Sequence, residues 1–466
     1  MNKTSILNKD DEPSKTRKSD IKYTNSKTKN MINKLSILSL FLFLSATAFS
    51  QSNLTLSEAI RISLENNYQL QISELNVEIA KNNNSWGQVG RYPTLGFSLA
   101  QTNRFDDAPS QTSPDNEQYL STSLRPAIQL NWILFNGFSI SLNKKNLQLL
   151  ENMTNENFSI VLENTLQAVV LAYSKILIEQ EKLVVLEKVK NLSKDRYDYL
   201  LIKKELGNAV TFDVLQAKTS YLSDSSNVLL QSMNLRNSKR NLNLLLGESV
   251  DTKYFYVDEL NIPAEDYKMV DLLSKMFSNN KNLKNQYINQ KILRNNISLK
   301  KSSLYPTISL SSGYDHSNSS IKYEGIDKMT SNSYDYYANF ALSYNLFNGG
   351  NIRRAIKNAK IEQEIGDVQL EEMKNSLSIQ LISNFELYNV RKQLFLVAEE
   401  SMKAAQLNLQ ISNEKFKSGA INSFNYRDVQ LIYQNAAINR LEAIYNLIDS
   451  NTELLQLTSG IVSVYK

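Results

Sequence analysis

The side chains that usually carry catalysis or bind metals are scarce in this sequence. His316 is the only histidine and there is no cysteine, which excludes a histidine-based triad and a multi-histidine or thiolate metal site within one chain. We expect His316 to lie in a solvent-exposed loop. No GxxxxGK loop is present to hold a nucleotide phosphate. The sequence therefore predicts a protein that is not an enzyme and uses no cofactor.

The charge distribution argues against nucleic-acid binding. The basic excess of the chain lies within residues 1–50, and the remainder carries as many acidic as basic side chains. A nucleic-acid binder is expected to be basic in its folded part, because neutralising phosphates drives that binding. Nucleic acid is therefore not an expected partner.

Residues 31–50 have the layout of a secretory signal peptide, with a short basic start, an apolar stretch from Leu35 to Leu44 and small residues up to Ser50. Ten apolar residues are too few for a helix to span a bilayer, so we expect cleavage after Ser50 rather than a membrane anchor. Residues 1–30 are then a disordered extension, or they precede the true start at Met31. No later stretch approaches eighteen consecutive apolar residues, so we expect no transmembrane helix.

Three landmarks occur twice in the same order, about 212 residues apart. They are LFNG at 134–137 and 346–349, YPT at 92–94 and 305–307, and the glycines Gly207 and Gly419. Three matches at one spacing indicate a tandem duplication. We expect a first repeat over 51–247, a connecting segment over 248–267, a second repeat over 268–460 and a C-terminal tail over 461–466.

Each repeat is expected to contain a helix, two strands, a long helix and a further helix. A helical period covers about 56–91 and stops at Pro93. Four segments of about 10 to 13 residues then alternate in polarity, which predicts strands. We expect a loop at Pro109 and Pro114, and Pro126 near a strand start or a bulge.

The alternation gives each predicted strand one apolar and one polar face. The apolar faces carry Leu95, Phe97, Leu99, Leu124, Ile128, Leu130, Trp132, Leu134, Ile308, Leu310, Tyr314, Ala338, Phe340, Leu342, Tyr344 and Leu346. The polar faces carry Thr94, Ser98, Gln129, Asn131, Ser309, Asn339 and Asn345. Such faces suit lipid on one side and a wet lumen on the other.

The helices after each LFNG are unusually long. Residues 138–206 contain no proline or glycine, and 351–418 contain only Gly366. About 69 residues would form a rod of about 100 Å. Coiled-coil spacing recurs at Leu162, Leu166, Val169, Tyr173 and Ile176, and every seventh residue at Val214, Tyr221, Val228, Leu235 and Leu242. We expect the long helix to run beside both shorter helices, with the strands at one end and the glycine turn at the other.

Four strands cannot close a barrel, and open edges are not tolerated in lipid. Either several chains share a barrel or the strands are not in a membrane. The polar faces favour a water-filled lumen, which needs more than about eight strands. Three copies would supply twelve.

The order of these motifs over 54–460 resembles the outer membrane efflux protein family, the TolC-like exit ducts. The resemblance implies a homotrimer in the cell outer membrane, with a twelve-stranded β-barrel and a periplasmic α-helical coiled-coil tunnel. It implies a passive channel for efflux or secretion that docks to a periplasmic adaptor (membrane fusion) protein and an inner-membrane pump or secretion ATPase. The cargo stays open among drugs, metals and proteins, as does the pump family. The competing hypothesis is a soluble periplasmic coiled-coil adaptor or scaffold.

The resemblance also assigns roles to residues. The periplasmic tips, which open and dock the adaptor, would contain Gly207, Asn208, Phe212, Asp213, Phe416, Gly419, Phe424, Asn425 and Asp428. The barrel-to-tunnel junctions would contain Pro93, Asn136, Gly137, Pro306, Asn348 and Gly349.

This chain departs from the family's pattern at the second tip. The family has acids six and nine places after the second glycine, where this chain has Asn425 and Asp428. Ile421 stands where a basic residue often forms a closing salt bridge. Whether the tips rest closed, and by which contacts, stays open; packing of Phe416, Phe212 and Phe424 is the alternative basis for gating.

Overall fold

The computed structural model describes residues 53–110, 113–323 and 327–465. The expected extension at 1–30 and signal peptide at 31–50 lie outside the described residues. Almost all described residues belong to one compact unit, and a small second unit includes Leu54 and residues 253–255.

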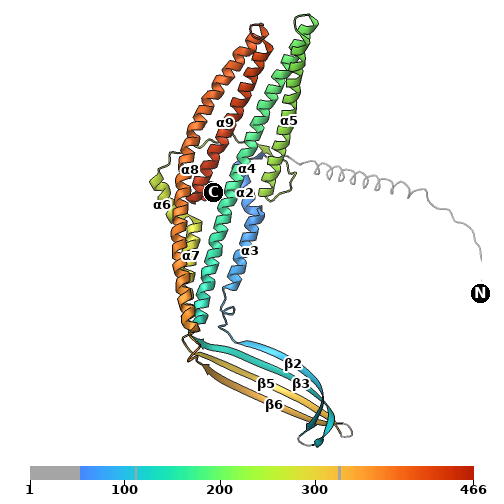
Figure 1. Ribbon diagram of the computed structural model, residues 1–466, viewed down its shortest axis with the longest axis vertical. Helices are drawn as coiled ribbons and strands as arrows, with labels where there is room; N and C mark the ends of the chain where they lie inside the picture. Colours follow the sequence, from blue (N-terminus) through green and yellow to red (C-terminus); the bar gives the residue numbers. More distant parts are fainter. Residues whose placement is uncertain (1–52, 111–112, 324–326, 466) are drawn as a thin grey trace, which may run out of the picture. The chain divides into compact units, whose positions relative to one another are not determined.

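The two halves of the chain contain the same elements in the same order (Figure 1). The first half contains β1 (Asn53–Leu54), α2 (Leu56–Asn66), α3 (Tyr68–Asn83), β2 (Thr94–Ser110), β3 (Ser113–Asn136), α4 (Ser139–Glu205) and α5 (Thr211–Leu245). The second half contains β4 (Phe255–Tyr256), α6 (Met269–Asn279), α7 (Lys281–Ser302), β5 (Thr307–Tyr323), β6 (Met329–Ser343), α8 (Asn351–Lys417) and α9 (Ser423–Leu457), followed by α10 (Ile461–Tyr465).

The long helices are confirmed. Helices α4 and α8 have 67 residues each, and α5 and α9 have 35 each. Helix α4 packs against α2, α3 and α5, so one long helix runs beside both shorter ones, as predicted. Helices α8 and α9 form the second hairpin, and α4 also packs against α9 (Figure 1).

The expected helix seams are largely buried. Leu166, Val169, Tyr173 and Ile176 of α4 are each at most 1% exposed. Among the described residues, α4 alone is long and apolar enough to meet the criteria for a membrane-spanning helix, with a mean hydropathy of 1.3. Half of that apolar window is buried inside the protein, as in a core helix.

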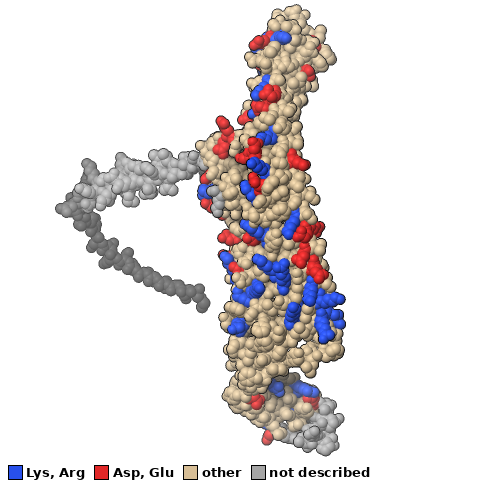
Figure 2. All heavy atoms as spheres, turned by 90° about the vertical axis from the view of Figure 1, so that its left-hand side faces the viewer, with Lys and Arg blue, Asp and Glu red and all other residues tan. Residues whose placement is uncertain are grey.

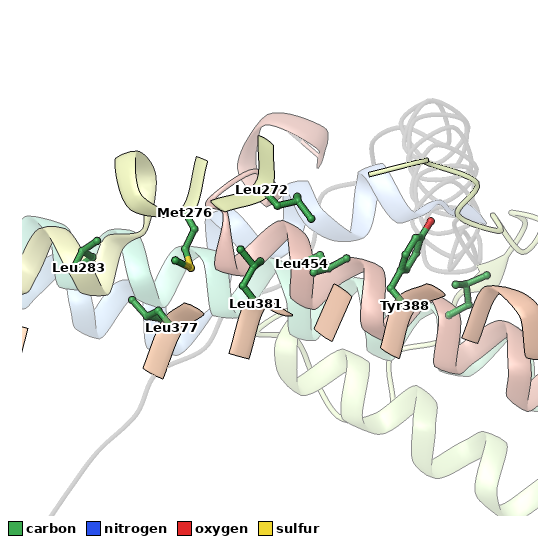
Figure 3. Packing of buried hydrophobic residues seen from close by; sticks show 8 residues of the cluster. Leu272, Met276, Leu283, Leu377, Leu381, Tyr388 and Leu454 are labelled. Carbon is green, nitrogen blue, oxygen red and sulfur yellow. The ribbon is translucent and has the colours of Figure 1, made fainter. Parts of the chain in front are cut away.

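The second half has a hydrophobic core where the four helices α6, α7, α8 and α9 meet (Figure 3). Met276 of α6 and Leu283 of α7 belong to one cluster with Leu377 and Leu381 of α8, and Leu454 of α9 completes it. These five side chains are almost fully buried. Burying each stabilises the fold by about 1.5–3 kcal/mol, which fixes the short helices against the long ones.

The helix expected before each strand pair is in fact two helices, so the prediction of one continuous helix over 56–91 was wrong. The breaks lie at Asn67 and Asn280, both buried. The Asn67 Oδ1 accepts the backbone N–H of Gln69 at 2.9 Å and caps α3, while its Nδ2 donates to the Leu245 carbonyl at 2.7 Å. The amide thus starts one helix and completes the end of another, which offsets the lost helical bonds.

Asn280 has the same role in the second half. Its Oδ1 accepts the N–H of Leu283 at 3.0 Å and its Nδ2 donates to the Leu457 carbonyl at 3.0 Å. Replacing Asn280 by alanine should cost about 1–3 kcal/mol, because a helix cap and a buried carbonyl both lose their partner. Hydrogen exchange at the first turn of α7 should accelerate. Asn280→Ser keeps a cap acceptor without burying a charge, so the acceleration should be smaller; equal acceleration in the two variants would contradict this account.

The strands form one antiparallel sheet in the order β2-β3-β5-β6. Its register groups residues of one kind across all four strands. One row contains Phe97, Ile128, Tyr314 and Tyr336, and a row on the opposite face contains Thr94, Asn131, Ser311 and Asn339. The predicted alternation of apolar and polar faces is confirmed within these rows.

The strands are longer than predicted, at 17, 24, 17 and 15 residues. Pro109 and Pro114 lie in strands, not in a loop, since pairing continues past the apolar rows. Pro109 is tolerated because β2 is an edge strand. Pro126 lies inside the central strand β3, not near its start, and the ladder to β5 is interrupted at Arg125 and Pro126.

Two further residues depart from the expected alternation. A bulge between Ile133 and Phe135 removes Leu134 from the row of Trp132, so that Phe135 faces Ile308. Strand β6 ends at Ser343, so Tyr344, Asn345 and Leu346 lie beyond it. The reason is that β6 is an edge strand, with no partner on its outer side in the described sheet.

Candidate functional site

The two hairpins α4–α5 and α8–α9 end in matching glycine turns, here called the first tip (206–210) and the second tip (418–422). Gly207 has φ +77° and Gly419 has φ +79°. The Asn208 N–H donates to the Lys203 carbonyl at 2.7 Å and the Ala420 N–H to the Lys415 carbonyl at 2.8 Å. These are the bonds of a Schellman cap, which requires a left-handed residue and hence favours glycine.

The residues assigned to the tips all lie on or beside these turns. Asn208, Asn425 and Asp428 are exposed, and Asp213 is half-buried in the first turn of α5. Asn422 was not among the predicted tip residues; its Oδ1 accepts the N–H of Asn425 at 2.8 Å and caps α9. An Asn three residues after a turn glycine and just before a helical run was the available signal.

Of the three phenylalanines expected to pack at the tips, only Phe416 does so within the chain. Its ring stacks on Tyr426 at 4.7 Å and meets Tyr199 edge-on at 5.1 Å. Phe212 and Phe424 are 71% and 66% exposed. The expectation that they pack with Phe416 is therefore wrong within one chain, because both side chains point off the first turn of their helices.

An unpredicted polar cluster joins the two hairpins on the sheet side of the tips. It consists of Ser193 and Arg196 of α4, Asp224 of α5 and Arg427 of α9, and is called the arginine cluster here. The Arg427 guanidinium binds both carboxylate oxygens of Asp224, at 2.7 and 2.8 Å. It also donates to the Ser193 hydroxyl at 2.9 Å, and Ser193 donates to Asp224.

Arg196 leaves this cluster one positive charge in excess. It is 3% exposed, and its Nη1 donates to the Ser423 carbonyl at the start of α9 at 3.1 Å. Its Nε and Nη2 have no hydrogen-bond partner among the described residues. Burial, and then the charge of Arg427, lower the pKa of Arg196 to about 10, so it stays charged at neutral pH.

The arginine cluster can act as a tie between hairpins. A buried bidentate pair costs several kcal/mol to break by removing one partner. The surplus charge of Arg196 opposes burial at the same place. The contact is thus strong, but it carries a surplus positive charge. It joins hairpins near the second tip, where Ile421 cannot form the salt bridge that a basic residue would form.

The first junction is tightly built. Gly137 has φ +65°, and a Cβ on it would lie 2.2 Å from the Ser302 carbonyl oxygen. Phe138 is also left-handed, with φ +70°. The Asn136 Oδ1 accepts the N–H of Ile140 at 3.3 Å. Only glycine fits at 137, because the end of α7 occupies the space of a side chain.

The second junction has the same LFNG sequence as the first but a different structure. Gly349 and Gly350 are both left-handed, at φ +62° and +79°, and nothing lies within 4 Å of a Cβ on Gly349. Leu346 and Phe347 are 88% and 87% exposed, outside any strand. Pro93 and Pro306 directly precede β2 and β5, so each assigned junction residue lies between sheet and helices.

His316 lies within β5 and is half-buried, so its assignment to an exposed loop was wrong. Its ring stacks on Tyr334 at 4.4 Å, and its Nδ1 lies 3.0 Å from the Ser333 carbonyl oxygen. Within the described ranges, no group of three or more His, Cys, Asp or Glu side chains is arranged to hold a metal ion.

Comparison with known proteins agrees with this architecture. Residues 272–460 match the family model described as outer membrane efflux protein. No curated protein matches the chain.

Among solved structures, a membrane protein from Pseudomonas aeruginosa is 14% identical, with a TM-score of 0.70 over 86% of this chain and 93% of that one. The CmeC outer membrane channel of Campylobacter jejuni is 14% identical, with a TM-score of 0.69 over 87% and 85%. The outer membrane protein VceC of Vibrio cholerae is 12% identical, with a TM-score of 0.67 over 87% and 96%.

These similarities cover nearly the whole chain at low identity, so they establish the fold. The predicted location in the cell outer membrane agrees with the matched family. The resemblance found in the sequence is confirmed: residues 272–460 match the model of the outer membrane efflux protein family, and the chain shares the fold of the outer-membrane channels compared above.

Proposed function

We propose that three copies of this chain form an outer-membrane exit duct for efflux or secretion, with a twelve-stranded barrel and a helical tunnel in the periplasm. One observation carries the proposal: the sheet has an apolar face, a polar face and two free edges. Phe97 and Phe340 on the apolar face are 70% and 73% exposed. In water this exposed apolar face would promote aggregation, whereas a closed barrel in the membrane would place it against lipid.

Pairing inside the chain suggests how copies join. Strand β3 pairs with β5 down to Asn136 opposite Thr307. If the halves arose by duplication, the equivalent pair is Asn348 of β6's extension opposite Thr94 of β2 in the next copy. This supports a closed ring, and it explains why the second LFNG is unpaired in one chain: its partner strand belongs to a neighbour.

The polar rows would line the lumen of such a barrel. Thr94, Asn131, Ser311 and Asn339 form one of these rows, and larger barrels with polar interiors hold water. The long helices would continue this lumen as a tunnel. Since the sequence has no nucleotide-binding loop, movement of cargo would be passive, with energy supplied by an inner-membrane pump or secretion ATPase.

The tips would close the tunnel and receive a periplasmic adaptor. Gly207 and Gly419 make the turns, and Asp213 and Asp428 would give the entrance a negative charge. Exposed Phe212 and Phe424 would contact the adaptor or neighbouring copies. The arginine cluster would hold the hairpins of one copy together in the resting state, in place of the salt bridge that Ile421 cannot form.

A soluble coiled-coil adaptor or scaffold is the competing function. It accounts for the paired helices but leaves the apolar sheet face without a partner. The experiment is to express the full chain and fractionate the cells. We expect a heat-resistant, trimer-sized band in the outer-membrane fraction, and discrete ion conductance when the protein is added to a planar bilayer. Recovery as a single soluble chain in the periplasm would contradict the proposal.

A further inference from the structure

A strongly basic surface lies on the helices nearest the sheet in the second half of the chain. Helix α7 contains no acidic residue, and the first acid of α8 is Glu362. Eight exposed side chains form what we call the basic patch: Lys291, Arg294, Lys300, Lys301, Arg353, Arg354, Lys357 and Lys360. Figure 2 shows Lys and Arg gathered over this part of the surface. The balanced charge of the whole chain conceals it.

The basic patch is uncompensated within one chain. None of its eight side chains forms an ion pair with the described residues, although α7 and α8 pack together. The only basic residue of α7 with an ion-pair partner is Lys281, which lies 3.5 Å from Glu156 and outside the patch. Arg354 alone makes hydrogen bonds, to the Gly349 carbonyl at 3.0 Å and to Asn351. Like charges kept together without a partner indicate an anionic ligand.

Packing does not require these charges. The equivalent positions of the first half, 212 or 213 residues earlier, are Glu78, Lys81, Gly87, Gln88, Ser141, Leu142, Lys145 and Gln148. Only two of these are basic and one is acidic. The same helix pairing is therefore built without a patch, so its presence in the second half needs another explanation.

The position of the basic patch relative to the sheet indicates the ligand. Exposed aromatic side chains lie where the sheet meets the helices: Tyr92 and Tyr305 just before β2 and β5, Trp132 near the end of β3 and Tyr344 just after β6. Such rings mark the boundary between hydrocarbon and headgroups. Lys300 and Lys301 lie in the last turn of α7, and Arg353 lies in the first turn of α8. With the sheet in the membrane, these turns would lie at the depth of the lipid headgroups. The remaining residues lie within about 15 Å along the helices.

We propose that the basic patch binds anionic phospholipid headgroups of the inner leaflet of the outer membrane. The proposal rests on the proposed function, since it requires the sheet to be in that membrane. Clusters of four to eight Lys and Arg beside a membrane attract anionic lipid, with a range set by the Debye length of about 10 Å. Three copies would present three separate patches around the ring.

The test compares lipids bound to the purified full-length protein by native mass spectrometry, using phosphatidylglycerol and phosphatidylcholine with the same acyl chains. The variant changes seven residues of the patch to glutamine and keeps Arg354, whose bond to Gly349 supports the junction. Wild type should prefer phosphatidylglycerol by about tenfold or more, and the variant should lose that preference. Lys81→Gln with Lys145→Gln, at the equivalent positions of the first half, should keep it.

Three results would overturn the inference: a variant with unchanged lipid preference and unchanged ion selectivity, a loss of the trimer in the variant, or an altered ion selectivity with lipid preference intact. The second result would make the patch a contact between copies, and the third would place it in the lumen. If the variant still forms a conducting trimer without a change in lipid preference, the proposed function stands and only the lipid site fails.

Discussion

Replacing Asp224 by alanine is expected to separate the two hairpins near the tips and to raise the resting conductance of the protein in planar bilayers. The change removes the carboxylate that binds the Arg427 guanidinium at 2.7 and 2.8 Å. Arg427 and Arg196 then lie in the cluster without an anion. Removing one member of a buried pair costs about 3–5 kcal/mol. Hydrogen exchange should accelerate in the parts of α4, α5 and α9 that carry the cluster, and should not change beside the sheet.

Arg196→Met is the matched control, because it is expected not to accelerate hydrogen exchange near the tips. This change removes a buried charge whose Nε and Nη2 have no partner in the described residues, and it loses one bond, to the Ser423 carbonyl. Exchange near the tips should slow or stay constant. The double variant should be less disturbed than Asp224→Ala alone, since one of the two uncompensated charges is gone. Wild-type exchange and conductance in Asp224→Ala would show that the arginine cluster does not hold the tips.

Gly137→Ala is expected to give a larger loss of folded protein than the same change at the tip glycine Gly207. A Cβ there would lie 2.2 Å from the Ser302 carbonyl oxygen and 3.0 Å from the Tyr305 Cβ, so the end of α7 would have to move. The left-handed backbone costs about 1–2 kcal/mol for any residue other than glycine, and overpacking adds about 1–3 kcal/mol. The midpoint of chemical unfolding in detergent measures the sum.

Gly207→Ala separates the two contributions. Gly207 has φ +77° and nothing within 4 Å of a Cβ, so alanine there meets only the backbone cost. The midpoint should fall less than in Gly137→Ala. Equal losses in the two variants would mean that the contact with Ser302 contributes nothing to the junction.

The parts of this fold that the sequence predicted are those with a local period. Uninterrupted helical spacing predicted α4 and α8, strict alternation predicted the two faces of the sheet, and glycine at a helix end predicted the turns at Gly207 and Gly419. Each of these signals lies within one element and depends on backbone geometry. These signals can be detected without knowing which other segment an element packs against or pairs with.

The parts that the sequence did not predict depend on residues far apart in the chain. Asn67 breaks a helix because it reaches the carbonyl of Leu245, and a propensity scale assigns it no such role. The arginine cluster draws on three helices, with Ser193 and Arg427 separated by 234 residues. The two LFNG segments differ because β3 is a central strand and β6 is an edge strand. Identical letters adopt different structures when their neighbours differ.

The central claim is that copies of this chain close one barrel by pairing β6 with β2 of the next copy. The chain has no cysteine, so a cysteine pair at Asn348 and Thr94 can be introduced without background reaction. A second pair at Asn136 and Thr307, which face each other within one chain, reports on the same geometry inside a single copy.

Under mild oxidation the Asn348 and Thr94 cysteines should join three copies covalently, giving a trimer-sized band on a denaturing gel that disappears on reduction. The control pair should form its disulfide without any change in the number of linked chains. A control that oxidises fully beside a test pair that yields only single chains would contradict the shared barrel, and with it the proposed duct.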